Sequence, residues 1–344
     1  MSRYNSTKKT IVTYNGKSGA YNYFKPMSDE KLASLREQFY AKPDFLEVKK
    51  QIKKGIQGGT QNNLITKYYF RELMSKTRVY PSNWSIEDAF THKDILSIHY
   101  GKIYQQNFFL SESKTTEENE FSKLLTSFRL GGSSICAMPT NFPVKTVDKI
   151  LQKYNINNNY YDPSCGWGAR LFSSMKNNVN YYGTDPNYLL IEKLQEFAND
   201  FESQAGFFFP KVSLRCSGSE VLQEDLINKI GVVFTSPPYF LLEDYKIGNQ
   251  SANQNTNYDD WLENYLRPTF KNIYKYLVKD GNCLINIADY KKFTLVDDTI
   301  RIAEECGFKL VATENLSLVN RPTLDKIGID KKEGILVFKR IEDC

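Results

Sequence analysis

Strands and helices alternate along the last two thirds of this 344-residue chain, and this alternation limits the possible folds more than any other feature. Short β-favouring runs are separated by segments whose apolar residues recur at helical spacing. The expected strands are 160–161, 180–183, 212–216, 232–235, 283–288, 310–319 and 334–340. The expected helices are 144–154, one from residue 169, 189–201, 220–228, 258–277 and 294–306. The pattern predicts an α/β fold, a Rossmann-like domain whose mostly parallel seven-stranded sheet has helices on both faces.

The first 130 residues follow a different pattern. Residues 1–25 are polar and rich in tyrosine, have no clear period, and are expected to form a loosely ordered arm. Apolar positions at helical spacing follow at 28–54, 64–74 and 85–99. We therefore expect two domains, a mainly α-helical N-terminal one at 1–130 and the α/β domain at 131–344.

Charge divides the chain at nearly the same place. Residues 1–132 carry 21 Lys and Arg against 13 Asp and Glu, a net charge of +8. The remaining residues carry 24 against 27, a net charge of −3. A basic part beside a mildly acidic one indicates where a polyanion such as nucleic acid would be held, although a solvated basic face has the same composition.

The composition argues against several other classes of protein. No run of 18 apolar residues is present, and the polar first 19 residues do not resemble a signal peptide. Six cysteines without metal-like spacing indicate reduced thiols in a cytoplasmic protein. With only two histidines, His92 and His99, a zinc site or a histidine-based triad is hard to assemble, and we expect no metal.

A glycine-containing turn follows the first expected strand, in the run Tyr-Asp-Pro-Ser-Cys-Gly-Trp-Gly-Ala-Arg at 161–170. Glycines are needed where a ligand approaches the main chain too closely for a Cβ atom, although a plain turn needs them too. Asp162 would repel a pyrophosphate and suits a ligand that presents an amino group. Trp167 lies between the two glycines and serves either packing or base stacking.

Acidic and small polar residues follow the next two strands. Asp185 ends the second strand, where a carboxylate accepts hydrogen bonds from ribose hydroxyls; capping of the following helix is the alternative. Ser219 and Glu220 follow the third strand, where we expect contacts to an adenine edge.

The fourth strand, 232–235, ends in Ser236-Pro237-Pro238-Tyr239. Two prolines remove two N–H donors and stiffen the backbone, so that the segment is rich in hydrogen-bond acceptors. Acceptors for both hydrogens of an exocyclic base amino group concentrate electron density on its nitrogen, which suits attack on an activated methyl group. Tyr239 adds a flat face for a base swung out of its stack.

These motifs together resemble those of a known family. Asp-Pro-x-x-Gly-x-Gly, followed about 70 residues later by Ser-Pro-Pro-Tyr, is similar to the S-adenosylmethionine-dependent amino-methyltransferases that make N6-methyladenine or N4-methylcytosine in DNA. Thr140 to Pro143 resembles the family's cofactor-binding segment. Residues 240–245 and 286–289 resemble a phage and bacterial branch, in which Glu243 and Tyr245 either order the loop over the base or form an ordinary surface loop. The resemblance covers about 130–340 and leaves 1–130 without a counterpart.

The resemblance implies S-adenosylmethionine as cofactor and assigns roles by position. Asp162, Gly166 and Gly168 would line its methionine part, and Asp185 its ribose. The remaining cofactor residues would be Asn141, Phe142, Ser164, Ser219 and Glu220. The base would face Ser236, Pro237, Pro238 and Tyr239, which are the expected catalytic residues. At Ser219 such enzymes often have Asp, so the adenine contact is in doubt there and Glu220 is the substitute.

The target base is left open between cytosine N4, which Ser at the first motif position favours, and adenine N6. DNA is the expected partner, with base flipping and with recognition by the N-terminal domain and the loop at 320–333. Expected phosphate contacts are Lys49, Lys50, Lys53, Lys54 and Arg321. The alternatives are an RNA amino-methyltransferase of the same fold and an inactive DNA-binding relative. The sequence does not decide the oligomeric state or whether a restriction partner exists.

Overall fold

The computed structural model describes the chain in stretches. They are residues 9–14, 17–22, 26–57, 63–105, 121–122, 124–125, 128, 135–206, 209–247, 249–255, 257–289, 293–315 and 334–341. The predicted domain boundary at 130 and 131 and the expected contact Arg321 lie outside the described residues.

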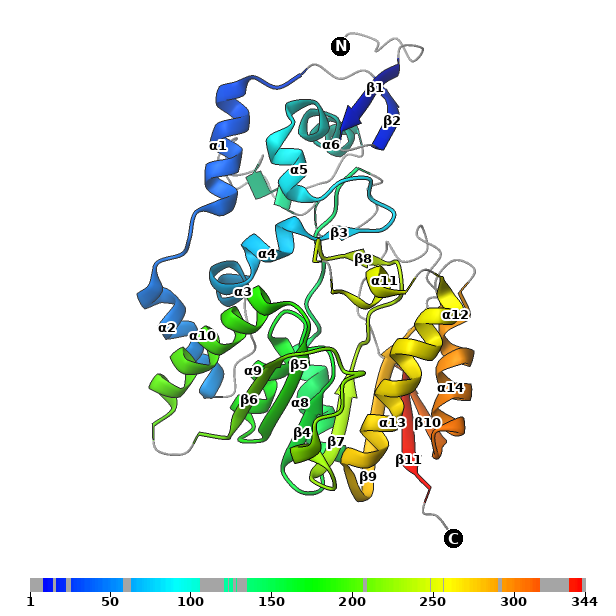
Figure 1. The fold of residues 1–344 in the computed structure, drawn as a ribbon. Coiled ribbons are helices and arrows are strands. Elements are labelled where there is room, and N and C mark those ends of the chain that lie inside the picture. Colours follow the sequence, from blue (N-terminus) through cyan, green and yellow to red (C-terminus); the bar gives the residue numbers. More distant parts are fainter. Residues whose placement is uncertain are drawn as a thin grey trace.

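A seven-stranded sheet forms the centre of the α/β part (Figure 1). Its strands are β4 (Asn159–Asp162), β5 (Asn180–Asp185), β6 (Val212–Cys216), β7 (Ile230–Thr235), β9 (Leu277–Ile287), β10 (Phe308–Asn315) and β11 (Gly334–Arg340). They lie in the order β10-β11-β9-β7-β4-β5-β6, and only β11 runs antiparallel to its neighbours. Successive strands proceed outward from β4 to β6, and the chain then returns to β7 on the other side of β4. This reversal is the point at which ligands bind in such sheets, so the predicted α/β class is confirmed and the site is located.

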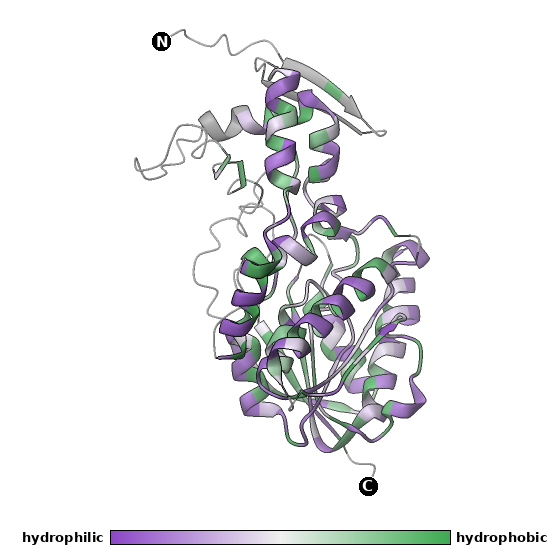
Figure 2. Cartoon of the chain, turned by 90° about the vertical axis from the view of Figure 1, so that its left-hand side faces the viewer, coloured by the Kyte–Doolittle hydropathy of each residue, from purple (hydrophilic) through white to green (hydrophobic). Residues whose placement is uncertain are grey.

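Helices cover both faces of this sheet. One face packs on α8 (Val144–Tyr154), α9 (Ala169–Lys176) and α10 (Tyr188–Ala205). The other packs on a continuous run of helix, α12 (Tyr258–Trp261), the π-helical η2 (Leu262–Leu266) and α13 (Arg267–Tyr276), and on α14 (Leu295–Glu305). Alternate strand residues explain the two cores, since Tyr160 and Val232 point to the first face and Tyr161 and Val233 to the second. In Figure 2 hydrophilic residues occupy the outer sides of these helices.

The predicted helix at 220–228 is wrong. This stretch is a turn with a single 3-10 segment, η1 (Glu224–Leu226), and a short α11 (Ser251–Gln254) follows only after β7. The backbone N–H of Gln223 is held at 2.6 Å by the hydroxyl of Tyr276 on α13, so tertiary contacts fix the turn instead of a helical ladder.

The N-terminal part contains the helices α1 (Asp29–Tyr40), α2 (Phe45–Ile56), α3 (Asn63–Tyr69), α4 (Arg71–Lys76), α5 (Ile86–Thr91) and α6 (Lys93–Gln105). Where the structure describes the expected loose arm, its residues instead form an antiparallel pair of strands, β1 (Lys9–Tyr14) and β2 (Lys17–Asn22). A short strand, β3 (Arg78–Val79), pairs with β8 (Glu243–Asp244) of the α/β part. No helix of the described residues has the length and apolar character needed to span a membrane.

One hydrophobic core joins the N-terminal part to the sheet. Helices α2 and α3 lie against α10, as Figure 1 shows. The ring of Phe70, just after α3, lies 6.2 Å from that of Phe197 on α10, centroid to centroid. Both residues belong to the same buried cluster as Tyr160 and Val232 of the sheet. The packing is therefore continuous between the helical part and one face of the sheet.

Candidate functional site

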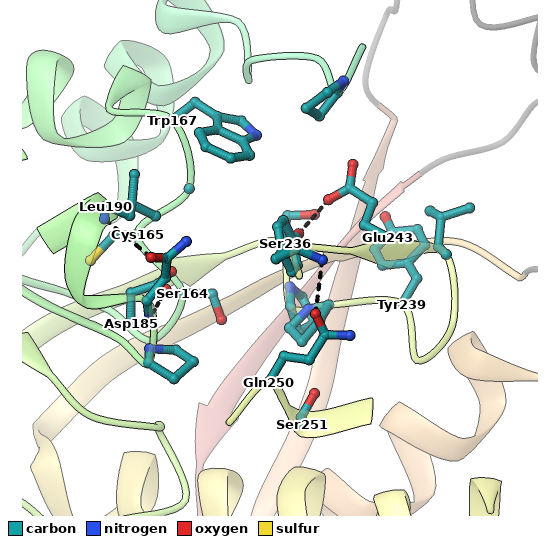
Figure 3. A pocket seen from close by; sticks show the side chains of 18 of the residues that line it. Ser164, Cys165, Trp167, Asp185, Leu190, Ser236, Tyr239, Glu243, Gln250 and Ser251 are labelled. Atoms are coloured by element: carbon teal, nitrogen blue, oxygen red, sulfur yellow. Dashed lines mark hydrogen bonds between the residues drawn. The ribbon is translucent and has the colours of Figure 1, made fainter. Parts of the chain in front are cut away.

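A cavity of about 280 Å³ opens where β4, β5, β6 and β7 end (Figure 3). Its walls come from the loops after these strands, from the segment before α8, and from Val79 of β3 and Tyr80 after it. Of the expected site residues it is lined by Asn141, Phe142, Ser164, Gly166, Asp185, Ser219, Glu220, Ser236, Pro237, Pro238 and Tyr239. Asp162, Gly168 and the four lysines do not line it.

The glycine turn between β4 and α9 explains why two glycines are needed. Gly166 has φ +58° and lines the cavity, whereas Gly168 has φ +80° and caps α9. A Cβ atom on Gly168 would lie 2.8 Å from Cε2 and Cζ of Phe70. The second glycine therefore serves the contact between α9 and the N-terminal part, and only the first faces the space where a ligand would lie.

Asp162 lies beneath the cavity, not on its wall. Its carboxylate is fully buried and accepts from Arg170 Nε at 2.8 Å and from the Tyr181 hydroxyl at 2.8 Å. Arg170 also donates to the carbonyl of Ser164. Burial lowers the pKa of the guanidinium, but the charge of the Asp162 carboxylate outweighs this effect and raises the pKa above its ordinary value. The negative charge of Asp162 is therefore paired with the Arg170 guanidinium, where the sequence analysis expected a ligand amino group. Asp162 thus fixes the turn from behind.

The segment before α8 braces the same turn. Asn141 donates from Nδ2 to the carbonyl of Trp167 at 2.8 Å, and its Oδ1 accepts from the N–H of Phe142 at 3.0 Å. The Phe142 ring packs edge-on against Phe234 of β7 at 5.3 Å between centroids. Trp167 is 7% exposed, lines the cavity, and lies 6.1 Å from the ring of Tyr245, so it packs within the wall.

Asp185 ends β5 with its side chain half-buried in the cavity wall. Its Oδ1 accepts from the N–H of Asn187 at 3.0 Å, and the side chain of Asn187 caps α10 through the N–H of Leu190 at 3.3 Å. Capping therefore falls to Asn187 and leaves the carboxyl of Asp185 facing the cavity. Loss of solvation in the wall raises its pKa to about 7, and the nearby charge of Asp162 adds to the effect.

Ser219 and Glu220, which follow β6, differ in whether their polar atoms already have hydrogen-bond partners. Ser219 is 2% exposed, and its hydroxyl lies 2.8 Å from that of Thr269 while its carbonyl accepts from Asn272 at 3.0 Å. The Oε2 atom of Glu220, by contrast, is buried and has no hydrogen-bond partner among the described residues. Gly218 makes room for this carboxyl, since a Cβ there would lie 2.1 Å from Oε1 of Glu220. An unsatisfied buried acceptor in a cavity wall suits a ligand that donates hydrogen bonds.

The Ser236–Tyr239 turn faces the other end of the cavity. Asn286 of β9 donates to the Ser236 hydroxyl at 3.3 Å, and the Tyr239 hydroxyl donates to the carbonyl of Asn286 at 3.4 Å. Tyr239 is 8% exposed and packs in the second core cluster. Phe240, with φ +47°, turns the chain away immediately after the motif. Asn286 is a site residue that the sequence reasoning quoted only as part of a family segment.

The strand β8 brings Glu243 to the same end of the cavity. The hydroxyl of Tyr245 donates to Glu243 Oε2, and burial raises the pKa of this carboxyl above its ordinary value. The N–H of Tyr80 donates to the carbonyl of Leu242 at 2.8 Å, next to the β3–β8 pair. Val79 and Tyr80 thus form a wall of the cavity that comes from the N-terminal part. No motif marks them, so the sequence reasoning did not include them.

The four lysines expected to contact phosphates belong to α2, which runs next to α10 on the flank of the sheet (Figure 1). They are Lys49, Lys50, Lys53 and Lys54. Lys50 pairs with Glu47 at 2.5 Å, and the Lys49 ammonium lies 4.7 Å from the Phe45 ring centroid. Lys53 and Lys54 are exposed in the last turn. Within the described residues no group of three or more His, Cys, Asp or Glu side chains is arranged to hold a metal ion.

Comparisons with known proteins identify no family. No family model matches the sequence, and no curated protein matches it. Solved structures resemble it over a little more than half of the chain. A TehB-like SAM-dependent methyltransferase from Corynebacterium glutamicum is 15% identical with a TM-score of 0.38, over 57% of this chain and 87% of that one. The glycopeptide N-methyltransferase MtfA complexed with S-adenosyl-L-methionine is 10% identical with a TM-score of 0.38, over 58% and 87%. The [4+2]-cyclase SpnF is 9% identical with a TM-score of 0.42, over 58% and 81%.

Proposed function

We propose that this protein transfers a methyl group from S-adenosylmethionine to the exocyclic amino group of a base in DNA, either cytosine N4 or adenine N6. One observation carries the proposal. A single cavity has the glycine turn and Asp185 at one end and the acceptor-rich Ser236–Tyr239 turn at the other. A donor bound at the first end and a base bound at the second would therefore meet inside one enclosed volume.

The first end fits an adenosyl ligand on its own chemistry. Asp185 offers carboxylate oxygens to the ribose hydroxyls, and Glu220 has a buried oxygen to which no described residue donates. Gly166 lines the cavity in a left-handed conformation that suits glycine, and Asn141 and Phe142 line it beside the same turn. When bound, the cofactor supplies a methyl group activated by positive charge on sulfur. Asp162 and Gly168 would act only by shaping the turn.

The second end fits an amino group. The Ser236 hydroxyl receives a hydrogen bond from Asn286, which orients its lone pairs, and the proline at 237 adds a carbonyl without an N–H. These acceptors would take both amino hydrogens and turn the nitrogen lone pair toward the methyl donor. The ring of Tyr239, held through its hydroxyl, would cover the base. An amino group reaches this depth only when the base leaves the duplex, so base flipping belongs to the proposal.

The preference for DNA rests on the resemblance of the motifs and on the basic N-terminal part. Helices α4, α5 and α6 of this part lie beyond the end of the sheet at which β5 and β7 end (Figure 1), and Val79 and Tyr80 form part of the cavity wall. Target recognition by this part follows from that position. Lys49, Lys50, Lys53 and Lys54 would then contact phosphates along the flank rather than at the target base.

The test is transfer of label from methyl-labelled S-adenosylmethionine to duplex DNA and, in parallel, to RNA. The proposal expects label in DNA, lost in Ser236→Ala and retained in Asp259→Asn, an exposed carboxylate that does not line the cavity. Label in RNA alone would show that the substrate class is wrong. No transfer to either, together with no binding of S-adenosylmethionine in calorimetry, would refute the methyltransferase. Sequencing that separates N6-methyladenine from N4-methylcytosine then identifies the base.

A further inference from the structure

Three carboxyl groups line the cavity among the described residues: Asp185, Glu220 and Glu243. Asp185 ends β5 and Glu220 follows β6, at the end proposed for the adenosyl ligand. Glu243 instead follows the Ser236–Tyr239 turn by only a few residues and lies with Ser236 and Tyr239 around one part of the cavity (Figure 3). It is the carboxyl group nearest in the chain to the groups that would hold the target amino nitrogen.

Glu243 is held in one orientation by contacts from two directions. The Tyr245 hydroxyl donates to Oε2, while Oε1 makes no hydrogen bond with the described residues. The β3–β8 ladder pairs Glu243 with Val79, and the next rung pairs Asp244 with Arg78. Because successive side chains of a strand point to opposite sides, Asp244 turns away and meets Arg78 at 3.6 Å. One oxygen of Glu243 is therefore fixed and the other is left for a ligand.

The methyl transfer that we propose leaves a proton to be removed. The nitrogen lone pair forms the new N–C bond as the S–C bond breaks, and sulfur keeps that electron pair as a neutral thioether. Positive charge develops on the nitrogen as the N–C bond forms and makes its hydrogens acidic, so a base that takes one of them as a proton in the same step lowers the barrier to transfer. Ser236 cannot take this proton, because a hydroxyl is a very weak base at neutral pH. A carboxylate in the same water-poor space can.

The geometry points to Glu243 as the group that accepts this proton from the methylated amino nitrogen, through Oε1. This inference rests on the proposed function and adds a catalytic residue to it. Proton transfer turns the carboxylate into a neutral acid within the cavity wall, which removes an ion that no cation among the described residues pairs with at 4 Å or less. The raised pKa of Glu243 makes its carboxylate a stronger base than an exposed glutamate.

The groups around Glu243 let its titration be followed. Tyr245, Tyr239 and Tyr80 line the cavity together with Glu243, and tyrosine hydroxyls ionise only at high pH. On the far side of the strand Arg78 and Asp244 form a pair of opposite charges. The acid limb of the rate profile is therefore expected to report Glu243, and Asp185 at the other end is expected to change binding of the cofactor instead.

The experiment measures single-turnover methylation of duplex DNA at saturating S-adenosylmethionine, from pH 5 to pH 9, for wild type and Glu243→Gln. Glutamine keeps an oxygen for the Tyr245 hydroxyl but cannot take a proton. We expect the rate to fall roughly 100-fold, with the KM for DNA and the affinity for S-adenosylhomocysteine unchanged. The wild-type rate should rise through the Glu243 pKa to a plateau, and the variant should lack this rise. Glu243→Asp should recover part of the rate together with the pH dependence.

The outcomes separate this inference from the function on which it rests. Asp259→Asn is the control carboxylate and should match wild type. A Glu243→Gln rate within about three-fold of wild type would overturn the inference, as would a loss confined to KM, and either result would leave the methyltransferase intact. A wild-type protein that methylates no nucleic acid would instead refute the proposed function.

Discussion

Replacing Gly168 with alanine should destabilise the whole protein through a contact with the N-terminal part. Gly168 caps α9 at φ +80°, and a Cβ atom there would lie 2.8 Å from two ring atoms of Phe70. Two physical effects add at this position. One is the backbone cost of a left-handed conformation in a residue with a side chain. The other is a collision with a ring that is itself fully buried.

The magnitude follows from these two effects. A left-handed residue other than glycine costs about 1–2 kcal/mol, and the reduced freedom of the unfolded chain returns about 0.5 kcal/mol. Overpacking in a filled core costs about 1–3 kcal/mol. The free energy of unfolding of Gly168→Ala should therefore fall by about 2–4 kcal/mol. In a Phe70→Leu background the colliding atoms are absent, so the same substitution should cost only about 1 kcal/mol.

Urea unfolding of wild type, both single variants and the double variant closes a thermodynamic cycle. The reasoning predicts a coupling of about 1–3 kcal/mol between the two positions. If Gly168→Ala costs the same with Phe or Leu at position 70, to within about 0.5 kcal/mol, the ring contact plays no part and the explanation of the second glycine fails.

Three other predictions concern the site. Because the carboxyl of Asp185 has a pKa of about 7 and only its ionised form accepts both ribose hydroxyls well, the affinity for S-adenosylhomocysteine should rise roughly ten-fold from pH 6 to pH 8. Calorimetry should show no such rise for Asp185→Asn, and a flat wild-type profile would contradict the role. Arg170→Met leaves the buried Asp162 carboxylate without its cation and should lower the free energy of unfolding by about 3–5 kcal/mol; urea unfolding checks this, and a loss below about 1 kcal/mol would refute the pairing. Tyr239→Ala should lower kcat/KM on duplex DNA roughly 10–100-fold through lost stacking, whereas a wild-type rate would exclude that role.

The strands of the sheet could be predicted from the sequence because β-favouring runs end in turn-forming residues at regular intervals. Val232 to Thr235 is apolar and stops at two prolines, and the structure has β7 end at Thr235. The placement of site residues followed from the same logic, since strand ends gather at one edge of a parallel sheet. This is why Asp185 and Ser236, far apart in the chain, line one cavity.

The sequence reasoning failed where distant contacts override local pattern. Residues 220–228 have helical spacing, yet the Tyr276 hydroxyl holds the N–H of Gln223. The strands β3 and β8 are two residues each, too short for any period to reveal them, and each exists only because the other pairs with it. Burial of Asp162 beside Arg170 was equally hidden, because nothing in a one-dimensional pattern says that a carboxylate after a strand faces inward.

The β3–β8 pair bears on how this protein can be rebuilt from parts. Chimeras that exchange an N-terminal module assume that the α/β part folds and forms its site without that module. Here the loop carrying Glu243 takes its pairing partner from Arg78 and Val79, and the Tyr80 N–H binds the carbonyl of Leu242. A transplant joined after residue 130 would replace Val79 and Tyr80, so that the cavity of the α/β part would have a foreign wall. An exchange that preserves the cavity must keep residues 78–80 of this protein together with its α/β part. The junction of such a chimera must therefore lie within the N-terminal part and not at residue 130.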